Sequence, residues 1–216
     1  MIDILFEDSD ILVLIKPAGT LSEMSPAENS LPRMAGEERG AELFAVHRLD
    51  REVSGVMVYA KTPTAAAELS RQVADRSFKK EYLALVEGVP EEPSATLSDL
   101  LFKDSRKNKS FVVNRKRAGV KEASLFYETV DARDGKALVR IELHTGRTHQ
   151  IRVQFSSRKM PVLGDGKYGS SVREREIALA SYRINFKHPR TKECVEFSHL
   201  PTGDIWGAVE DLIENK

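Results

Sequence analysis

One short segment places several charged or titratable side chains directly before an apolar stretch. Residues 47–55 read His-Arg-Leu-Asp-Arg-Glu-Val-Ser-Gly, and Gly55–Lys61 is apolar and β-branched. The apolar run predicts a core strand, and loops that lead into core strands are where a rigid scaffold can present reactive groups. Composition alone favours a solvated charged loop, so the rest of the chain must decide between the two interpretations.

A second polar cluster occupies residues 146–152, which read Gly-Arg-Thr-His-Gln-Ile-Arg. Gly146 permits a tight turn, and the first N–H groups of a helix that begins there could face an anion. The guanidinium groups of Arg147 and Arg152 could bind phosphates or keep a carboxylate ionised in a partly buried site. An ordinary capped helix start explains the same residues equally well.

The elements that would position these two segments are mostly strands. Hydrophobic periodicity and turn residues predict helices over 62–75, with N-cap chemistry from Thr62-Pro63-Thr64, over 148–158, capped by Thr148, and over 204–215. Residues 20–40 show no clear period and are interpreted as a mobile surface loop, and residues 97–121 as a polar, basic excursion. The predicted strands cover residues 2–6, 11–16, 55–61, 79–86, 122–130, 137–143, 177–187 and 193–198, several of them as antiparallel neighbours. Without a dividing linker or a repeat, this pattern predicts one α+β domain over residues 1–216.

Taken together, the two polar segments resemble the RluA-type family of pseudouridine synthases. The hallmark of that family is a His-Arg-Leu-Asp motif followed by Thr-Ser-Gly, and its later motif reads Gly-Arg-Thr/Ser-His-Gln-Ile/Leu-Arg. The resemblance implies a curved, largely antiparallel sheet with flanking helices and a central RNA-binding cleft. Further agreement, in the family's order, comes from residues 16–19 (Lys-Pro-Ala-Gly), 80–84 (Lys-Glu-Tyr-Leu-Ala), 161–165 (Pro-Val-Leu-Gly-Asp), 168–169 (Tyr-Gly) and 188–189 (His-Pro).

The resemblance implies isomerisation of uridine in RNA without a cofactor or a metal. Asp50 would be the catalytic carboxylate, Tyr82 would lie against the uracil ring, and Arg152 would pair with Asp50. A buried uridine must be extruded before it can react, and Arg48, with His47 beside it, is the candidate to fill the space that the base leaves. Ribosomal and transfer RNA are both open as substrates, and a monomer is the default for the family.

The RNA contacts are expected from the catalytic domain, because the chain begins without the small S4-like module that many family members carry. The formal net charge is zero, so RNA must be recognised through local patches. Arg147 and His149 are candidates in the second motif. A basic run interleaved with aromatic rings supplies the other candidates, namely Lys103, Arg106, Lys107, Lys109, Arg115, Lys116 and Arg117.

Three departures from the family pattern are visible. Val53 stands where the motif usually has Thr, and a β-branched shape is kept, so we expect modest damage rather than inactivity. The segment after Gly19 lacks the usual Gly-containing continuation, which leaves its RNA contacts open. Ala180 occupies a place where several members carry His, and it receives no role.

Other classes of protein fit less well. A single cysteine, Cys194, and a start without a basic leader favour a reducing, cytoplasmic setting without a membrane span. Residues 164–169 contain the letters of a dinucleotide-binding fingerprint but do not open a helix after a first strand, so a turn is expected there. A metal site at His144 and His149 lacks a third ligand. The remaining alternatives are a non-catalytic RNA-binding protein or chaperone on the same fold, and a glycoside hydrolase that pairs Asp50 with Glu52.

Overall fold

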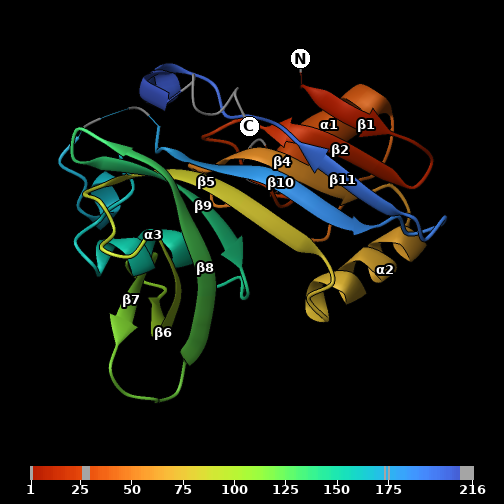
Figure 1. Ribbon diagram of the computed structural model, residues 1–216. Helices are drawn as coiled ribbons and strands as arrows, with labels where there is room; N and C mark the ends of the chain where they lie inside the picture. Colours follow the sequence, from red (N-terminus) through yellow and green to blue (C-terminus); the bar gives the residue numbers. More distant parts are fainter. Residues whose placement is uncertain (1, 26–29, 173, 175, 210–216) are drawn as a thin grey trace. The chain divides into compact units, whose positions relative to one another are not determined.

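The computed structural model describes residues 2–25, 30–172, 174 and 176–209. Within these residues, eleven strands form a mixed sheet that is accompanied by three α-helices (Figure 1). This confirms the predicted α+β class. The contacts between residues divide the chain into two compact units, Met1–Glu81 with Ala180–Pro201 and Tyr82–Leu179 with Thr202–Lys216, and each unit is described by itself.

The first unit is built on strands from both ends of the sequence. Hydrogen bonds place its strands in the order β1-β2-β4-β10, with β3 paired to β4 and β11 paired to β10. The β10–β4 pair is parallel, whereas β1–β2, β2–β4, β3–β4 and β10–β11 are antiparallel. The strands are β1 (Ile4–Glu7), β2 (Ile11–Lys16), β3 (Phe44–Ala45), β4 (Ser54–Ala60), β10 (Leu179–Lys187) and β11 (Cys194–Ser198).

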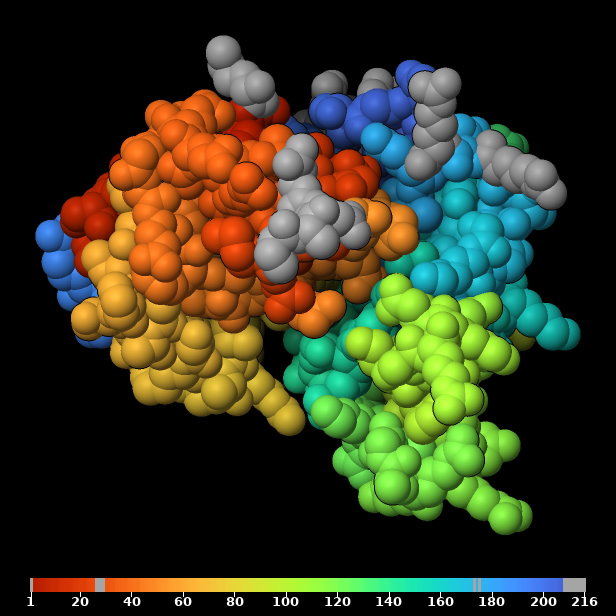
Figure 2. All heavy atoms as spheres, turned by 180° about the vertical axis from the view of Figure 1, so that it is seen from behind, coloured from red at the N-terminus to blue at the C-terminus, as the bar shows by residue number. Residues whose placement is uncertain are grey.

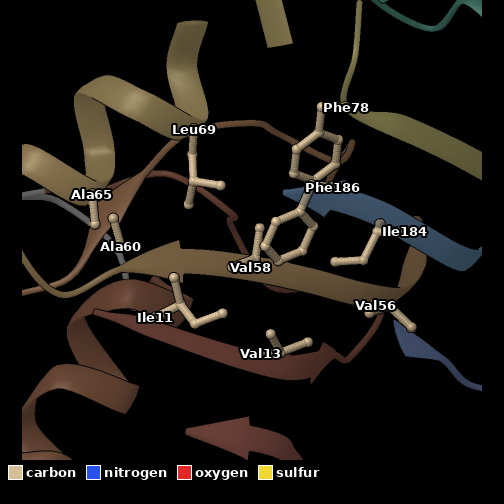
Figure 3. Packing of buried hydrophobic residues seen from close by; sticks show 10 residues of the cluster. All are labelled: Ile11, Val13, Val56, Val58, Ala60, Ala65, Leu69, Phe78, Ile184 and Phe186. Carbon is tan, nitrogen blue, oxygen red and sulfur yellow. The ribbon is translucent and has the colours of Figure 1, made fainter. Parts of the chain in front are cut away.

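Helix α2 (Pro63–Ala74) covers this sheet with a face that buries Leu69. Of the segment 62–64 predicted to supply the N-cap, Thr62 does so: its side chain accepts a hydrogen bond from the Ala65 N–H. Leu69 enters a core of β-branched residues from β2, β4 and β10, and the rings of Phe78 and Phe186 stack there with centroids 5.1 Å apart (Figure 3). This packing fixes β4, the strand that follows the Asp50 loop.

The interpretation of residues 20–40 as a mobile loop is wrong for their second half, where helix α1 (Leu31–Arg39) forms. The helix begins after Ser30, has a proline in its first turn and ends at Gly40, which adopts the left-handed conformation. Leu31 and Ala35 are buried. The buried stripe spans little more than one turn, which explains why no period was evident in the sequence.

The second unit contains a meander of longer strands in the order β5-β9-β8-β6-β7, of which β5 begins within the first unit at Lys79. The predicted hairpin between β8 and β9 is confirmed: Asp134 and Gly135 form its turn with positive φ angles of 52° and 70°. Helix α3 packs against β6 and β7. The elements are β5 (Lys79–Glu87), β6 (Ser94–Asp104), β7 (Lys109–Val113), β8 (Val120–Arg133), β9 (Lys136–Leu143), α3 (Gln150–Ser156) and the 3-10 turn η1 (Gly166–Tyr168).

Two further expectations differ from the structure. Most of residues 97–121, interpreted as a polar excursion, lie in the β6–β7 hairpin and the start of β8, where cross-strand pairing outweighs the polar composition. Near the end of the chain, Asp204–Val209 form a 3-10 helix (η2) that buries Trp206, and the rest of the predicted 204–215 helix lies outside the described residues. None of the described helices has the length and apolar character that crossing a membrane requires.

Candidate active site

The last residue of β2, Lys16, fixes the backbone of the loop that carries Asp50. The Lys16 side chain is fully buried, and its ammonium group donates hydrogen bonds to the carbonyls of Arg51 and Pro17 at 3.0 and 2.9 Å. The Gly19 N–H donates to the same Arg51 carbonyl at 2.8 Å. The Lys-Pro-Ala-Gly segment therefore clamps the backbone immediately after Asp50.

A serine hydroxyl fixes the backbone immediately before Asp50. Ser22 Oγ donates to the Leu49 carbonyl at 2.9 Å and accepts from the Leu49 N–H at 3.2 Å. The Tyr59 hydroxyl in turn donates to the Ser22 carbonyl at 2.8 Å. Val53 N–H bonds to the Asp50 carbonyl at 3.1 Å, which closes the turn, and the Val53 side chain is buried. Asp50 is thus presented, partly exposed, on a backbone tied at both sides.

Gly55 allows β4 to approach β10 where the loop enters the sheet. A Cβ atom at this position would lie 2.2 Å from the Ser181 carbonyl oxygen, and the φ angle of +115° is one that other residues rarely adopt. Ser181 pairs with Gly55, and its hydroxyl donates to the Val56 carbonyl at 3.0 Å. The Ser-Gly pair at the end of the first motif thus has a packing role.

The electrostatics of this loop depend on Lys16. Burial lowers the pKa of the Lys16 ammonium to about 8, and the nearby carboxylates of Glu52 and Asp50 act in the opposite direction. The Lys16 ammonium therefore lies close enough to these carboxylates to interact with them favourably. The structure therefore supplies a charge that suits a carboxylate nucleophile.

The other two candidates of the first motif lie in different environments. Arg48 is exposed and forms an exposed ion pair with Glu23 at 3.1 Å. His47 is buried, its Nε2 accepts a hydrogen bond from the Val58 N–H at 3.2 Å, and its ring lies 5.2 Å from that of Phe78. The predicted RNA contact of His47 stays a prediction.

Arg152 is held within the second unit by a buried ion pair. Its Nε and Nη2 donate to the two carboxylate oxygens of Asp165 at 2.6 and 2.9 Å, and both side chains are almost fully buried. The Arg152 guanidinium also lies over the Tyr168 ring, 5.2 Å from its centroid. The predicted pairing of Arg152 with Asp50 joins the two units and stays a prediction.

Tyr168 makes several of the hydrogen bonds around α3. Its hydroxyl accepts from the Ser110 N–H at 2.8 Å and lies 2.9 Å from His149 Nδ1, while its carbonyl accepts from Ser156 Oγ at 2.6 Å. His149 is buried, and its predicted RNA contact stays a prediction. Tyr168 links strand β7 to the helix that carries Arg152.

The start of α3 differs from the sequence prediction. The capping residue is His149, in a left-handed conformation, rather than Thr148, whose carbonyl accepts from Ser110 Oγ at 2.6 Å. Gln150 turns back and accepts from the Arg147 N–H at 3.0 Å. The Arg147 side chain donates from Nε to the Glu122 carbonyl at 2.9 Å and is partly exposed.

The remaining candidates lie on strands and loops of the second unit. Tyr82 is a buried residue of β5. The basic run follows the β6–β7 hairpin and the loop to β8, and Figure 2 shows this stretch, in yellow-green, on the surface. The Arg117 guanidinium lies 4.7 Å from the centroid of the Phe102 ring, and the Lys109 ammonium lies 4.8 Å from that of Tyr168. Lys103, Arg106, Lys107, Arg115, Lys116 and Arg117 are exposed, and Lys109 is partly buried.

One group of described residues brings together side chains of the kind that bind metals. Ligand atoms of Asp8, Asp10 and His188 lie within 4.8 Å of one another. His188 Nδ1 accepts hydrogen bonds from two backbone N–H groups, so its Nε2 carries the proton and faces Asp8 Oδ2 at 2.9 Å. Arg190 already pairs with Asp10 at 2.9 Å. These contacts tie the β1–β2 turn to the β10–β11 turn.

Comparison with known proteins identifies the family. The model of the RNA pseudouridylate synthase family matches residues 10–157, which is more than half of the chain. The chain belongs to this family. The match includes Asp50, Tyr82 and Arg152, while Asp165 and Tyr168 lie beyond its end.

Individual relatives agree with this assignment. An uncharacterized RNA pseudouridine synthase of Aquifex aeolicus is 35% identical over 221 aligned residues, covering 91% of this chain and 68% of the relative. Ribosomal large subunit pseudouridine synthase D of Zymomonas mobilis is 32% identical over 219 residues, covering 91% and 68%. Human RNA pseudouridylate synthase domain containing 1 superposes with a TM-score of 0.78 at 25% identity, covering 98% of this chain and 87% of the human chain.

Several residues that build the site received no role from the sequence. Lys16, Asp165 and Tyr168 lie in stretches that agree with the family, but nothing in their local pattern indicates which side chains they support. Ser22 lies in the segment that departs from the family pattern, yet it fixes Leu49. The sequence signal that could have pointed to them is a polar residue within an otherwise apolar segment or a turn.

Proposed function

We propose that this RNA pseudouridine synthase modifies uridine in large-subunit ribosomal RNA, with Asp50 as its catalytic carboxylate. The observation that carries the proposal is the position of Asp50 between two fixed backbone points, the Leu49 amide and the Arg51 carbonyl. The choice of ribosomal RNA rests on the named activity of the Zymomonas mobilis relative.

The reaction is an internal rearrangement of one nucleotide. The N1–C1′ bond breaks, the uracil turns over, and a C5–C1′ bond forms while the proton leaves C5 and N1 gains one. Atoms and electrons therefore balance without a redox partner. Asp50 reacts with the nucleoside as a carboxylate, and the nearby Lys16 charge interacts favourably with it.

Three further residues take the roles that the family resemblance implies. Tyr82 lies against the uracil, and Arg152 pairs with Asp50 and keeps it ionised and oriented. Arg48 fills the space left by the extruded base. Its exposed ion pair with Glu23 contributes little and is easily exchanged for contacts with RNA.

Site-resolved mapping of pseudouridine tests the proposed function. Ribosomal and transfer RNA are isolated separately from cells that lack the protein, and from the same cells after the wild-type gene is restored. We expect one or a few positions of large-subunit ribosomal RNA to lose pseudouridine and to regain it. Loss confined to transfer RNA would contradict the proposed substrate, and release of free uracil would favour hydrolysis over isomerisation.

A further inference from the structure

Lys80, the second residue of β5, is a partly buried cation without a partner among the described residues. Among the described residues, its ammonium group makes neither a hydrogen bond nor an ion pair. Burial lowers the pKa of Lys80 below its ordinary value. The next residue, Glu81, is by contrast paired with Arg183 at 2.7 Å. The preceding residue, Lys79, is exposed.

A second donor without a partner lies close to Lys80. His47 Nε2 accepts from the Val58 N–H, so the proton of the neutral ring is on Nδ1. That Nδ1 atom is buried and has no hydrogen-bond partner in the described part of the chain. Burial and the charge of Lys80 together lower the pKa of His47 to about 3, so the ring stays neutral and Lys80 supplies the positive charge.

A desolvated ammonium without a counter-ion destabilises the free protein. Such a charge is compensated when an anion binds, and RNA carries its anionic charge on its phosphates. Side chains alternate along a strand, so Lys80 points to the same face of β5 as Tyr82, two residues further on. The proposed function places Tyr82 against the uracil of the target nucleotide.

We propose that the Lys80 ammonium binds a backbone phosphate of the RNA at or beside the target uridine. The proposal rests on the proposed function for the identity of the polyanion. It assigns to Lys80 a binding role: the contact forms with the RNA and stays in place during the reaction. Its loss therefore raises KM and Kd much more than it lowers kcat.

The test compares Lys80→Met, which keeps the length and removes the charge, with Lys79→Met, the exposed neighbour that points to the opposite face. The probe is large-subunit ribosomal RNA transcribed with 5-tritiated uridine, so that turnover is followed as tritium release. For Lys80→Met we expect Kd and KM to rise about tenfold with kcat within about twofold. The slope of log Kd against log salt should fall by about 0.7–0.9. Lys79→Met should resemble the wild type.

Thermal unfolding of the free variants gives a second readout that a structural lysine would not produce. Because the unpaired charge is unfavourable, the Tm of Lys80→Met should equal or exceed that of the wild type. An unchanged Kd and salt slope for Lys80→Met would overturn the proposal, as would equal losses in Lys80→Met and Lys79→Met. If Lys80→Met does not fold, the unfavourable-charge argument is contradicted, and Lys80→Gln decides the RNA contact.

Failure of the proposed function gives a different pattern. In that case the wild type releases no tritium from the transcript. Binding of the transcript can still be measured at several salt concentrations for Lys80→Met and Lys79→Met. A smaller salt slope for Lys80→Met alone then supports the phosphate contact without turnover. If there is no turnover and the slope of log Kd against log salt is equal for Lys80→Met and Lys79→Met, both the proposed function and the phosphate contact are contradicted.

Discussion

The two segments that carry the proposed chemistry are supported in different ways. The Asp50 loop is tied through its backbone: Lys16 and Ser22 bind the main chain of Arg51 and Leu49. Arg152 is instead tied through its side chain, by Asp165, in a buried ion pair. The first arrangement fixes the main chain on both sides of Asp50, whereas the second fixes the direction of a guanidinium. Support through the backbone suits a nucleophile, whose side chain must react. Support through the side chain suits a cation that orients another group.

Removing Asp165 should have the largest effect on stability. Asp165→Ala leaves the buried Arg152 charge without its carboxylate, so the free energy of unfolding should fall by about 3–5 kcal/mol. Chemical denaturation measures the change. Glu122→Gln is the matched control, because it breaks an exposed ion pair with Lys116 and should leave the denaturation midpoint unchanged. Equal midpoints for Asp165→Ala and the wild type would show that the ion pair does not hold α3.

Lys16 should make the stability of the first unit depend on alkaline pH. Its folded-state pKa of about 8 lies below the ordinary value of 10.5, so the unfolded chain binds the proton more tightly between these values. The cost of burying the charge is complete below pH 8 and is relieved as the pH rises. We therefore expect the unfolding free energy of the wild type to gain about 3 kcal/mol relative to Lys16→Met between pH 8 and 10.5. A flat or falling difference would contradict this account.

Tyr168→Phe tests the hydrogen bonds around α3 while the ring stays in place. Loss of the hydroxyl leaves the buried Ser110 N–H without an acceptor, which should cost about 1–3 kcal/mol and lower kcat through α3. Tyr182→Phe is the control in the other unit, because the Tyr182 hydroxyl has no hydrogen bond in the described residues. If the two variants unfold at the same denaturant concentration, the hydrogen bonds of the Tyr168 hydroxyl do not stabilise the fold.

The smallest effect is expected on the basic run. Lys116 is exposed and paired with Glu122 at 2.6 Å, so Lys116→Gln should leave the Tm unchanged and weaken RNA binding a few-fold. Glu122→Gln removes the carboxylate that pairs with Lys116 and should strengthen RNA binding. Filter binding at several salt concentrations separates the two. Changes of the same sign in both variants would show that Lys116 does not contact RNA.

The two segments also differ in how much the sequence could predict. The Asp50 loop, β4 and α2 are contiguous, and their apolar run and Thr62 cap act locally, so pattern and structure agree. The support of Arg152 comes from Asp165 and Tyr168, which lie beyond the end of α3 in a turn. Local patterns carry no signal for such contacts. For the same reason, Thr148 is predicted as the cap of α3, although tertiary contacts of Gln150 and Ser110 move the cap to His149.

The central claim concerns the carboxylate of Asp50, and single-turnover tritium release tests it most directly. The assay compares Asp50→Asn, which keeps the shape and removes the charge, with Glu52→Gln, a second acid of the same loop. The account predicts that Asp50→Asn loses at least about a thousandfold in rate while it folds and binds RNA like the wild type, and that Glu52→Gln stays active. Turnover by Asp50→Asn near the wild-type rate would contradict it.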